Sequence, residues 1–168
     1  LNGLDGAYTQ ILLNSRPIFT SLLGVYGLEQ IPTNIIERVE VVRSGGSALY
    51  GSNAIAGTVN IITKDPILNT WEIGSNLAIV GGEALDRVVN FNSSIVADDL
   101  KSGVTLFGAY RNREAYDANG DGFTELVELR NTTVGAKAFV KPTDRSRVSL
   151  NLNAIREYRR GGDRLELA

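Results

Sequence analysis

The sequence predicts a two-part fold, in which a small α+β unit over residues 1 to about 66 precedes a run of antiparallel strands. Two contrasting patterns support this division. Short apolar runs interrupted by Gly and Pro fill the first part, whereas the second part alternates apolar and polar residues in stretches separated by polar turns. A third observation is that the chain contains neither Cys nor His. The fold therefore uses no disulfide and none of the common zinc sites.

Composition excludes several classes of function. The net charge of -2 leaves no excess of Lys and Arg to neutralise phosphates, so we expect no binding to nucleic acid. Without His and Cys, the usual catalytic triads and thiol nucleophiles are excluded. We therefore expect no enzyme and no organic cofactor. Met is also absent, which indicates that Leu1 begins a fragment or a processed product, with any export signal upstream.

Five elements are expected in the first part, on the basis of apolar alternation and turn residues. The first is a strand over residues 8–13, which is followed by a turn at Asn14-Ser15-Arg16-Pro17. One helical turn within residues 31–36, capped by Thr33 or Asn34, precedes a strand over residues 37–43 with one apolar face. A Gly-rich turn at residues 44–47 then leads into a helical turn that Ser47 could cap, and the last element is a strand over residues 58–64.

Five alternating strands are expected in the second part, over residues 71–79, 87–97, 104–110, 134–140 and 148–154. The connections differ in length: residues 97–101 and 141–145 form short turns, and residues 112–130 form a long loop. No apolar run reaches the roughly 18 residues of a membrane helix, so a membrane could be crossed only by strands of a barrel. Short turns at one end and long loops at the other are typical of outer-membrane barrels. An ordinary antiparallel sheet with one wet face shows the same alternation.

Residues 35–64 read IIERVEVVRSGGSALYGSNAIAGTVNIITK, and this stretch resembles the plug-domain motif of TonB-dependent outer-membrane receptors. Upstream, the strand and turn that end in Arg16-Pro17 are similar to the family's strand and Asp-Gly-Arg-Pro turn, with Asn14-Ser15 in place of Asp-Gly. The resemblance implies that residues 1–66 are the C-terminal half of a plug domain. Residues 67–168 would then be the first five or so strands of a truncated transmembrane β-barrel of about 22 strands. The resemblance also assigns structural or gating roles to Glu37, Arg38, Glu40, Arg43, Gly45, Gly46, Ser47, Tyr50 and Gly51.

The same resemblance implies a function. Such receptors lie in the outer membrane of Gram-negative bacteria, in contact with its lipid, and import a siderophore, haem, cobalamin or glycan. A TonB box upstream of Leu1 would pair with the TonB energy-transducing complex as an added strand. Because five strands leave their edges unpaired, we expect the isolated fragment to self-associate.

The long loop contains the most specific local motif of the chain. Residues 117–128 read DANGDGFTELVE and fit the D-x-[DN]-x-[DN]-G-x5-E spacing of a calcium loop. Carboxylate and amide oxygens with one backbone carbonyl can coordinate Ca²⁺, and these donors would come from Asp117, Asn119, Asp121, Phe123 and Glu128. We expect mutual repulsion of the carboxylates to keep the loop mobile without metal. A polar loop without metal has the same composition. If the loop does bind Ca²⁺, the alternative function is a secreted or surface Ca²⁺-dependent binding module with an antiparallel sheet.

Overall fold

The computed structural model describes residues 8–17, 31–43 and 54–163 of the chain, which divides into two compact units, Leu1–Asp65 and Pro66–Ala168. Each unit is described by itself. Among the described residues, no helical segment has the length and hydropathy needed to span a bilayer.

The first unit contains a four-stranded sheet with the strand order β2-β1-β4-β3. Its strands are β1 (Thr9–Leu13), β2 (Arg16–Pro17), β3 (Ile36–Val42) and β4 (Gly57–Thr63). β4 pairs with β1 in parallel and with β3 in antiparallel orientation. Its core consists of small and aliphatic side chains, because Ile11, Leu12, Ala54, Ala56 and Ile61 are all buried.

A tight hairpin turn joins β1 to β2. Leu13 pairs with Arg16, so only Asn14 and Ser15 form the loop, and both have positive φ, 50° and 64°. Positive φ at both central residues defines the type I′ turn, whose twist matches that of the flanking strands. The turn expected from the sequence is confirmed, and its second position carries a serine where glycine would be unstrained.

The helical turn before β3 differs in detail from the expectation. It is a 3-10 turn, η3 (Thr33–Ile35), whose N-cap is Pro32 with no side-chain cap hydrogen bond. Neither Thr33 nor Asn34 is the cap, because Pro32 already has the extended backbone required at that position. In β3 both faces are largely exposed, and Val39 and Val41 are about half accessible. The strand expected here is thus present, with Val39 and Val41 on one face, and within the described part of the unit this face is about half exposed.

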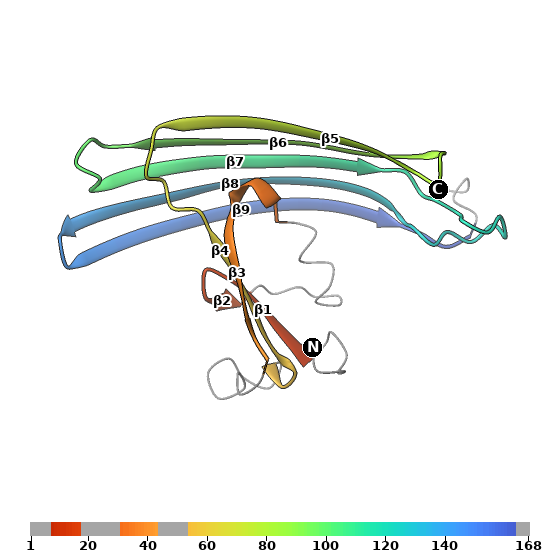
Figure 1. Cartoon of the computed structure of the whole chain (residues 1–168), viewed down its shortest axis with the longest axis horizontal. Helices are drawn as coiled ribbons and strands as arrows, with labels where there is room; N and C mark the ends of the chain where they lie inside the picture. The colour runs from red at the N-terminus through yellow and green to blue at the C-terminus, as the bar shows by residue number, and fades with distance from the viewer. Residues whose placement is uncertain (1–7, 18–30, 44–53, 164–168) are drawn as a thin grey trace. The chain divides into compact units, whose positions relative to one another are not determined.

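The second unit is one antiparallel sheet in which five strands follow each other in sequence order (Figure 1). This result confirms the five strands expected from the alternation. The strands are β5 (Thr70–Val80), β6 (Ala84–Val96), β7 (Ser102–Arg113), β8 (Glu128–Thr143) and β9 (Ser146–Arg160).

The two faces of this sheet have opposite character, and the apolar face is the exposed one. Trp71 is 78% exposed and Ile73 is 70% exposed. The opposite face buries polar side chains: Ser94 and Thr105 share a hydrogen bond of 3.0 Å, and Lys137 is 9% exposed. A water-soluble sheet with one wet face has the reverse arrangement. The aliphatic, phenylalanine and tryptophan side chains exposed on this face are Trp71, Ile73, Leu77, Ile79, Val89, Phe91, Ile95, Val104, Leu106, Val134, Val140, Val148, Leu150 and Leu152.

The strand connections lie at two opposite ends of the sheet (Figure 1). At one end, β6–β7 and β8–β9 are joined by short turns, and the latter is shorter than expected because β8 continues to Thr143. At the other end lie the glycine turn between β5 and β6 and the β7–β8 loop, which we define as residues 114–127. This loop is also shorter than expected, because β7 extends to Arg113 and β8 begins at Glu128.

Candidate functional site

The plug-motif residues that the structure describes lie on β3 and at its end. Arg38 forms two ion pairs along its own strand, with Glu37 at 2.8 Å and with Glu40 at 2.9 Å. About half of each side chain is exposed, so these pairs contribute little to stability. Arg43 follows the last residue of the strand. The remaining motif residues, Gly45, Gly46, Ser47, Tyr50 and Gly51, lie outside the described residues.

Glu40 belongs to a polar network that crosses the first sheet. The side-chain amide of Asn60, in β4, donates to Glu40 Oε2 at 3.1 Å. The Asn60 Oδ1 atom accepts the backbone N–H of Ser15 at 2.9 Å. Asn60 is 8% exposed and thus connects the plug motif on β3 to the β1–β2 turn through a buried amide.

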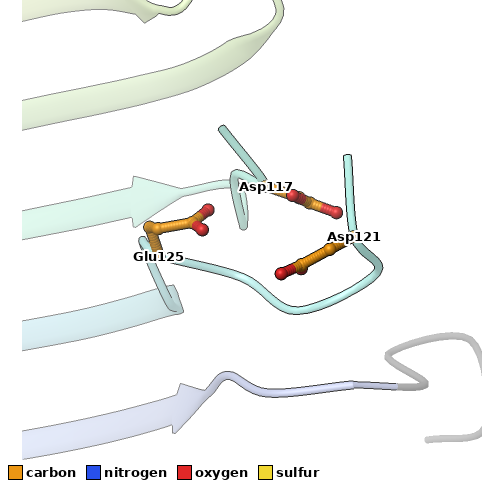
Figure 2. Close-up of side chains that lie close together, drawn as sticks. All are labelled: Asp117, Asp121 and Glu125. Carbon is orange, nitrogen blue, oxygen red and sulfur yellow. The ribbon is translucent and has the colours of Figure 1, made fainter. Parts of the chain in front are cut away.

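The β7–β8 loop brings three carboxylates together. Asp117, Asp121 and Glu125 each offer an oxygen that lies within 4.8 Å of the others, and Figure 2 shows the three side chains gathered along the loop. Asp117 is half-buried, and the other two side chains are exposed.

Backbone amides hold two of these carboxylates in place. Asp117 accepts the N–H groups of Gly120 and Gly122, one at each oxygen and both at 2.7 Å. Glu125 accepts the N–H of Ala118 at 2.6 Å. Both glycines have positive φ, 74° and 86°, a conformation that glycine adopts without steric cost.

Electrostatics at Asp117 favour the charged form. Partial desolvation is the largest single influence and pushes the pKa of Asp117 up, but backbone N–H groups of Gly122, Gly120, Asn119 and Asp121 together outweigh it and lower the pKa below its ordinary value. The carboxylate is therefore ionised at neutral pH. An ionised carboxylate has about four lone-pair sites, so Asp117 could accept both amides and still bind a cation.

The other expected calcium ligands are placed differently. Asn119 uses its side chain locally: Nδ2 donates to Asp121 at 3.1 Å, and Oδ1 accepts the Asp121 N–H at 3.0 Å. Phe123 is exposed at the tip of the loop. Glu128 is the first residue of β8 and forms an ion pair with Arg130 at 2.7 Å. The structure thus brings together Asp117 and Asp121 with Glu125, and it does not bring Glu128 into this cluster.

The sequence motif already contained the signal for Glu125. This residue occupies position 9 of the twelve-residue spacing, where a calcium loop often binds the ion through water. The base of the loop was not foreseen. Tyr116 and Leu126 form a backbone bridge with N···O distances of 2.9 and 3.1 Å, which brings the two ends of the acidic segment together.

Comparison with known families identifies the first unit. The sequence model of the TonB-dependent Receptor Plug Domain matches residues 1–58. Two curated relatives extend this likeness, and both are named vitamin B12 transporter BtuB. The protein from Vibrio vulnificus is 36% identical over 98 residues, which are 58% of this chain and 15% of the relative. The protein from Photobacterium profundum is 29% identical over 146 residues, which are 80% of this chain and 23% of the relative.

The family match covers residues 1–58, about a third of the chain, and together with these relatives it supports the TonB-dependent receptor family. Solved structures agree. The siderophore receptor PirA from Acinetobacter baumannii superposes with a TM-score of 0.77 at 25% identity, over 95% of this chain and 25% of that one. A Pseudomonas aeruginosa ferric enterobactin receptor (PfeA) mutant, in complex with enterobactin, gives a TM-score of 0.79 at 19% identity over 95% of this chain and 26% of that one.

These matches support the fold expected from the resemblance, a plug followed by part of a β-barrel. The chain spans about a quarter or less of the length of each of these relatives. The β5–β9 sheet is accordingly an open sheet whose edge strands are β5 and β9.

Proposed function

We propose that this chain functions in an outer-membrane receptor that binds a scarce nutrient and imports it with energy from the inner-membrane TonB complex. The family membership supports import, and the exposed apolar face of the β5–β9 sheet supports a membrane location. No catalytic role is proposed, because the relatives are named as transporters and receptors.

The inverted faces of the β5–β9 sheet are the observation that carries the location. Large apolar side chains cover the exposed face, while Thr105, Thr133 and Asn131 are buried on the other. Burial of apolar surface stabilises a protein by roughly 25 cal/mol per Å², so leaving a face of this size in water is unfavourable. We therefore expect lipid or another apolar surface to cover it. The strands have 11 to 16 residues, enough for the 9 to 11 that a tilted strand needs to cross a bilayer. This favours the outer membrane of a Gram-negative cell over the alternative, a soluble calcium-dependent module.

The ligand classes proposed are siderophore, haem, cobalamin and glycan. The names of the relatives support two of them, since these proteins are a vitamin B12 transporter and siderophore receptors. The partner proposed is TonB, with which a TonB box upstream of Leu1 would pair as an added strand.

Uptake by whole cells tests the proposal. The full-length receptor is expressed in a Gram-negative strain that lacks its own cobalamin and siderophore receptors. Uptake of radiolabelled cyanocobalamin and of ferric enterobactin is measured with TonB present and with TonB deleted. We expect the receptor in the outer-membrane fraction, with TonB-dependent uptake of at least one ligand. Receptor in the soluble fraction, or uptake that persists without TonB, would contradict the proposal.

We further propose that the β7–β8 loop binds Ca²⁺, a role supported by the convergence of three carboxylates within 4.8 Å. Hard cations prefer oxygen donors of this kind. Asp117, Asp121 and Glu125 would provide the charge and Asn119 an amide oxygen. Glu128 would have to leave its ion pair with Arg130 to take part.

Calorimetric titration of the full-length receptor with Ca²⁺ tests this second proposal. Extracellular modules bind with a Kd of about 10⁻⁴ to 10⁻³ M, so millimolar Ca²⁺ should give a measurable heat. Asp121→Ala should abolish the heat, and Glu128→Gln should leave most of it. Asp98→Ala is the matched control, because Asp98 is an exposed carboxylate in the turn between β6 and β7. A flat wild-type trace, or equal heats for wild type and Asp121→Ala, would refute the proposal.

A further inference from the structure

The β7–β8 loop contacts the neighbouring strand connection on one side. The ring of Tyr116 lies against Gly81, in the turn between β5 and β6, so closely that a Cβ atom at Gly81 would overlap the Tyr116 hydroxyl and ring. Glu114, also in the loop, forms two hydrogen bonds with Leu85 of β6 on the same side. Its backbone N–H donates to the Leu85 carbonyl, and its carboxylate accepts the Leu85 N–H, both at 2.9 Å. A side chain at position 81 would therefore displace the Tyr116 ring, and the φ of 62° also favours glycine there.

On its other side, the β7–β8 loop contacts the chain that follows β9. A Cβ atom at Gly161 would overlap the side chain of Val127. Three hydrogen bonds join Thr124 to Gly162. The Thr124 N–H and hydroxyl donate to the Gly162 carbonyl at 3.2 and 3.4 Å, and the Gly162 N–H donates to the Thr124 hydroxyl at 3.0 Å.

The ends of the loop are fixed as well. The backbone bridge between Tyr116 and Leu126 joins the two ends of the loop, just beyond the ends of β7 and β8. Closer to the strands, Arg113 Nε donates to the Val127 carbonyl at 3.2 Å, and Arg113 is only 8% exposed. The loop therefore contacts the β5–β6 turn and the start of β6 on one side, and the residues that follow β9 on the other.

We propose that the β7–β8 loop is a fixed strap across the strand ends, held by its contacts with Gly81 and Gly161. The strap keeps Asp117, Asp121 and Glu125 facing one another whether or not a cation is bound. This inference is the opposite of the expectation that carboxylate repulsion leaves the loop mobile, and the exchange experiment below separates the two. It depends on the contacts of the second unit alone, so it is independent of nutrient import and of calcium binding.

The consequence is a conformational link between the β5–β6 turn and the acidic cluster. Tyr116 precedes Asp117 directly, so displacing its ring from Gly81 moves the first carboxylate of the cluster. The amides of Gly120 and Gly122, which donate to Asp117, report that movement. Local opening of this kind is measured by hydrogen exchange.

The β5–β6 turn offers a matched pair of variants. Gly81 and Gly82 both have positive φ, 62° and 83°, so alanine strains the backbone at either position. Only at Gly81 does the new Cβ atom meet Tyr116, because nothing lies within 4 Å at Gly82. The difference between Gly81→Ala and Gly82→Ala therefore isolates the contact with Tyr116.

Hydrogen exchange of the full-length receptor in detergent, with Ca²⁺ chelated, is the test. In the wild type, the amides of Tyr116, Gly120, Gly122 and Leu126 should be protected. Gly81→Ala should speed their exchange by about tenfold or more, and Gly82→Ala should leave it near the wild-type rate. Gly161→Ala should act like Gly81→Ala from the other side.

Tyr116→Ala covers the case in which Gly81→Ala does not fold, because it removes the same contact without straining the turn. It should speed exchange as Gly81→Ala does, and the double variant should be no faster than either single variant, as expected for residues that share one contact. Unprotected amides in the chelated wild type would overturn the proposal. Equal exchange in wild type, Tyr116→Ala and Gly161→Ala would also overturn it.

Discussion

Arg111 donates two hydrogen bonds to the carboxylate of Asp86, from Nε to Oδ1 at 3.0 Å and from Nη2 to Oδ2 at 2.6 Å. The side chains are 26% and 13% exposed, and the pair joins β7 to β6 on the polar face of the sheet. Two parallel hydrogen bonds of this kind fix the geometry of both partners. The next residue along β6, Arg87, forms a longer pair of 3.5 Å with Glu114, and both of those side chains are about half exposed.

The first prediction contrasts these two ion pairs. Asp86→Ala should lower the free energy of unfolding by about 1–3 kcal/mol, because Arg111 loses its bidentate partner in a partly buried site. Arg87→Ala should cost less than about 1 kcal/mol, because its pair is exposed and screened. Guanidinium unfolding of the 168-residue chain, followed by the fluorescence of its single tryptophan, measures the free energies of unfolding of both variants. Equal losses for the two variants would contradict the ranking.

The second prediction concerns the strained serine in the turn between β1 and β2. Ser15 has a φ of 64°, which glycine adopts without steric cost, so Ser15→Gly should stabilise the first unit by about 0.5–1 kcal/mol. The variant gives up one weak hydrogen bond, from Asn60 to the Ser15 hydroxyl at 3.3 Å. Ser15→Ala is the control: it loses the same hydrogen bond and keeps the strain, so it should destabilise. Thermal unfolding of the three proteins distinguishes these effects, and stabilisation by alanine would count against the strain argument.

Local patterns in the sequence were sufficient to predict much of this fold. Alternation with a period of two depends only on neighbouring residues, and it located all five strands of the β5–β9 sheet. Turn chemistry likewise located the bend at Asn14 and Ser15. The strand ends were missed where pairing continues beyond the apolar alternation, as at Arg113 in β7. There the partner strand determines the extent of the sheet, and the sequence of one strand does not contain that information.

The acidic loop shows the same limit. The spacing pointed to Asp117 and Asp121, and the structure brings these two together. It also pointed to Glu128, but Glu128 pairs with Arg160 in the β8–β9 ladder and is drawn into the strand. The contact between Tyr116 and Gly81 joins two distant parts of the chain. No local pattern could have predicted it, because a glycine in a turn is already explained by its φ.

The third prediction contrasts two glycines that each lie beneath a phenylalanine of the facing strand. A Cβ atom at Gly135 would overlap Phe107, which is 8% exposed, and a Cβ atom at Gly108 would overlap Phe91, which is 43% exposed. The exposed ring can move aside, whereas the buried ring cannot do so without disturbing its neighbours. Gly135→Ala should therefore cost about 1–3 kcal/mol, and Gly108→Ala less than about 1 kcal/mol. A larger loss for Gly108→Ala, in the same guanidinium assay, would contradict this explanation.

The last prediction concerns pH. Desolvation raises the pKa of Asp117, but the backbone N–H groups of the loop, those of Gly122 and Gly120 foremost, together lower it below its ordinary value. The unfolded loop therefore takes up a proton at higher pH than the folded loop does. The stabilisation from this carboxylate is then complete above the unfolded value of about 3.9 and is lost as the pH falls through the lower native pKa. Protection of the Gly120 and Gly122 amides, corrected for intrinsic exchange rates, should thus stay constant from neutral pH to about pH 4 and then decrease. Asp117→Asn keeps the size of the side chain and removes this titration, so its protection should be weaker at neutral pH and should change less between pH 4 and pH 2. If wild type and Asp117→Asn lost protection in parallel over that interval, the decrease would have to come from other groups, and Asp117 would not be the residue that orders the loop.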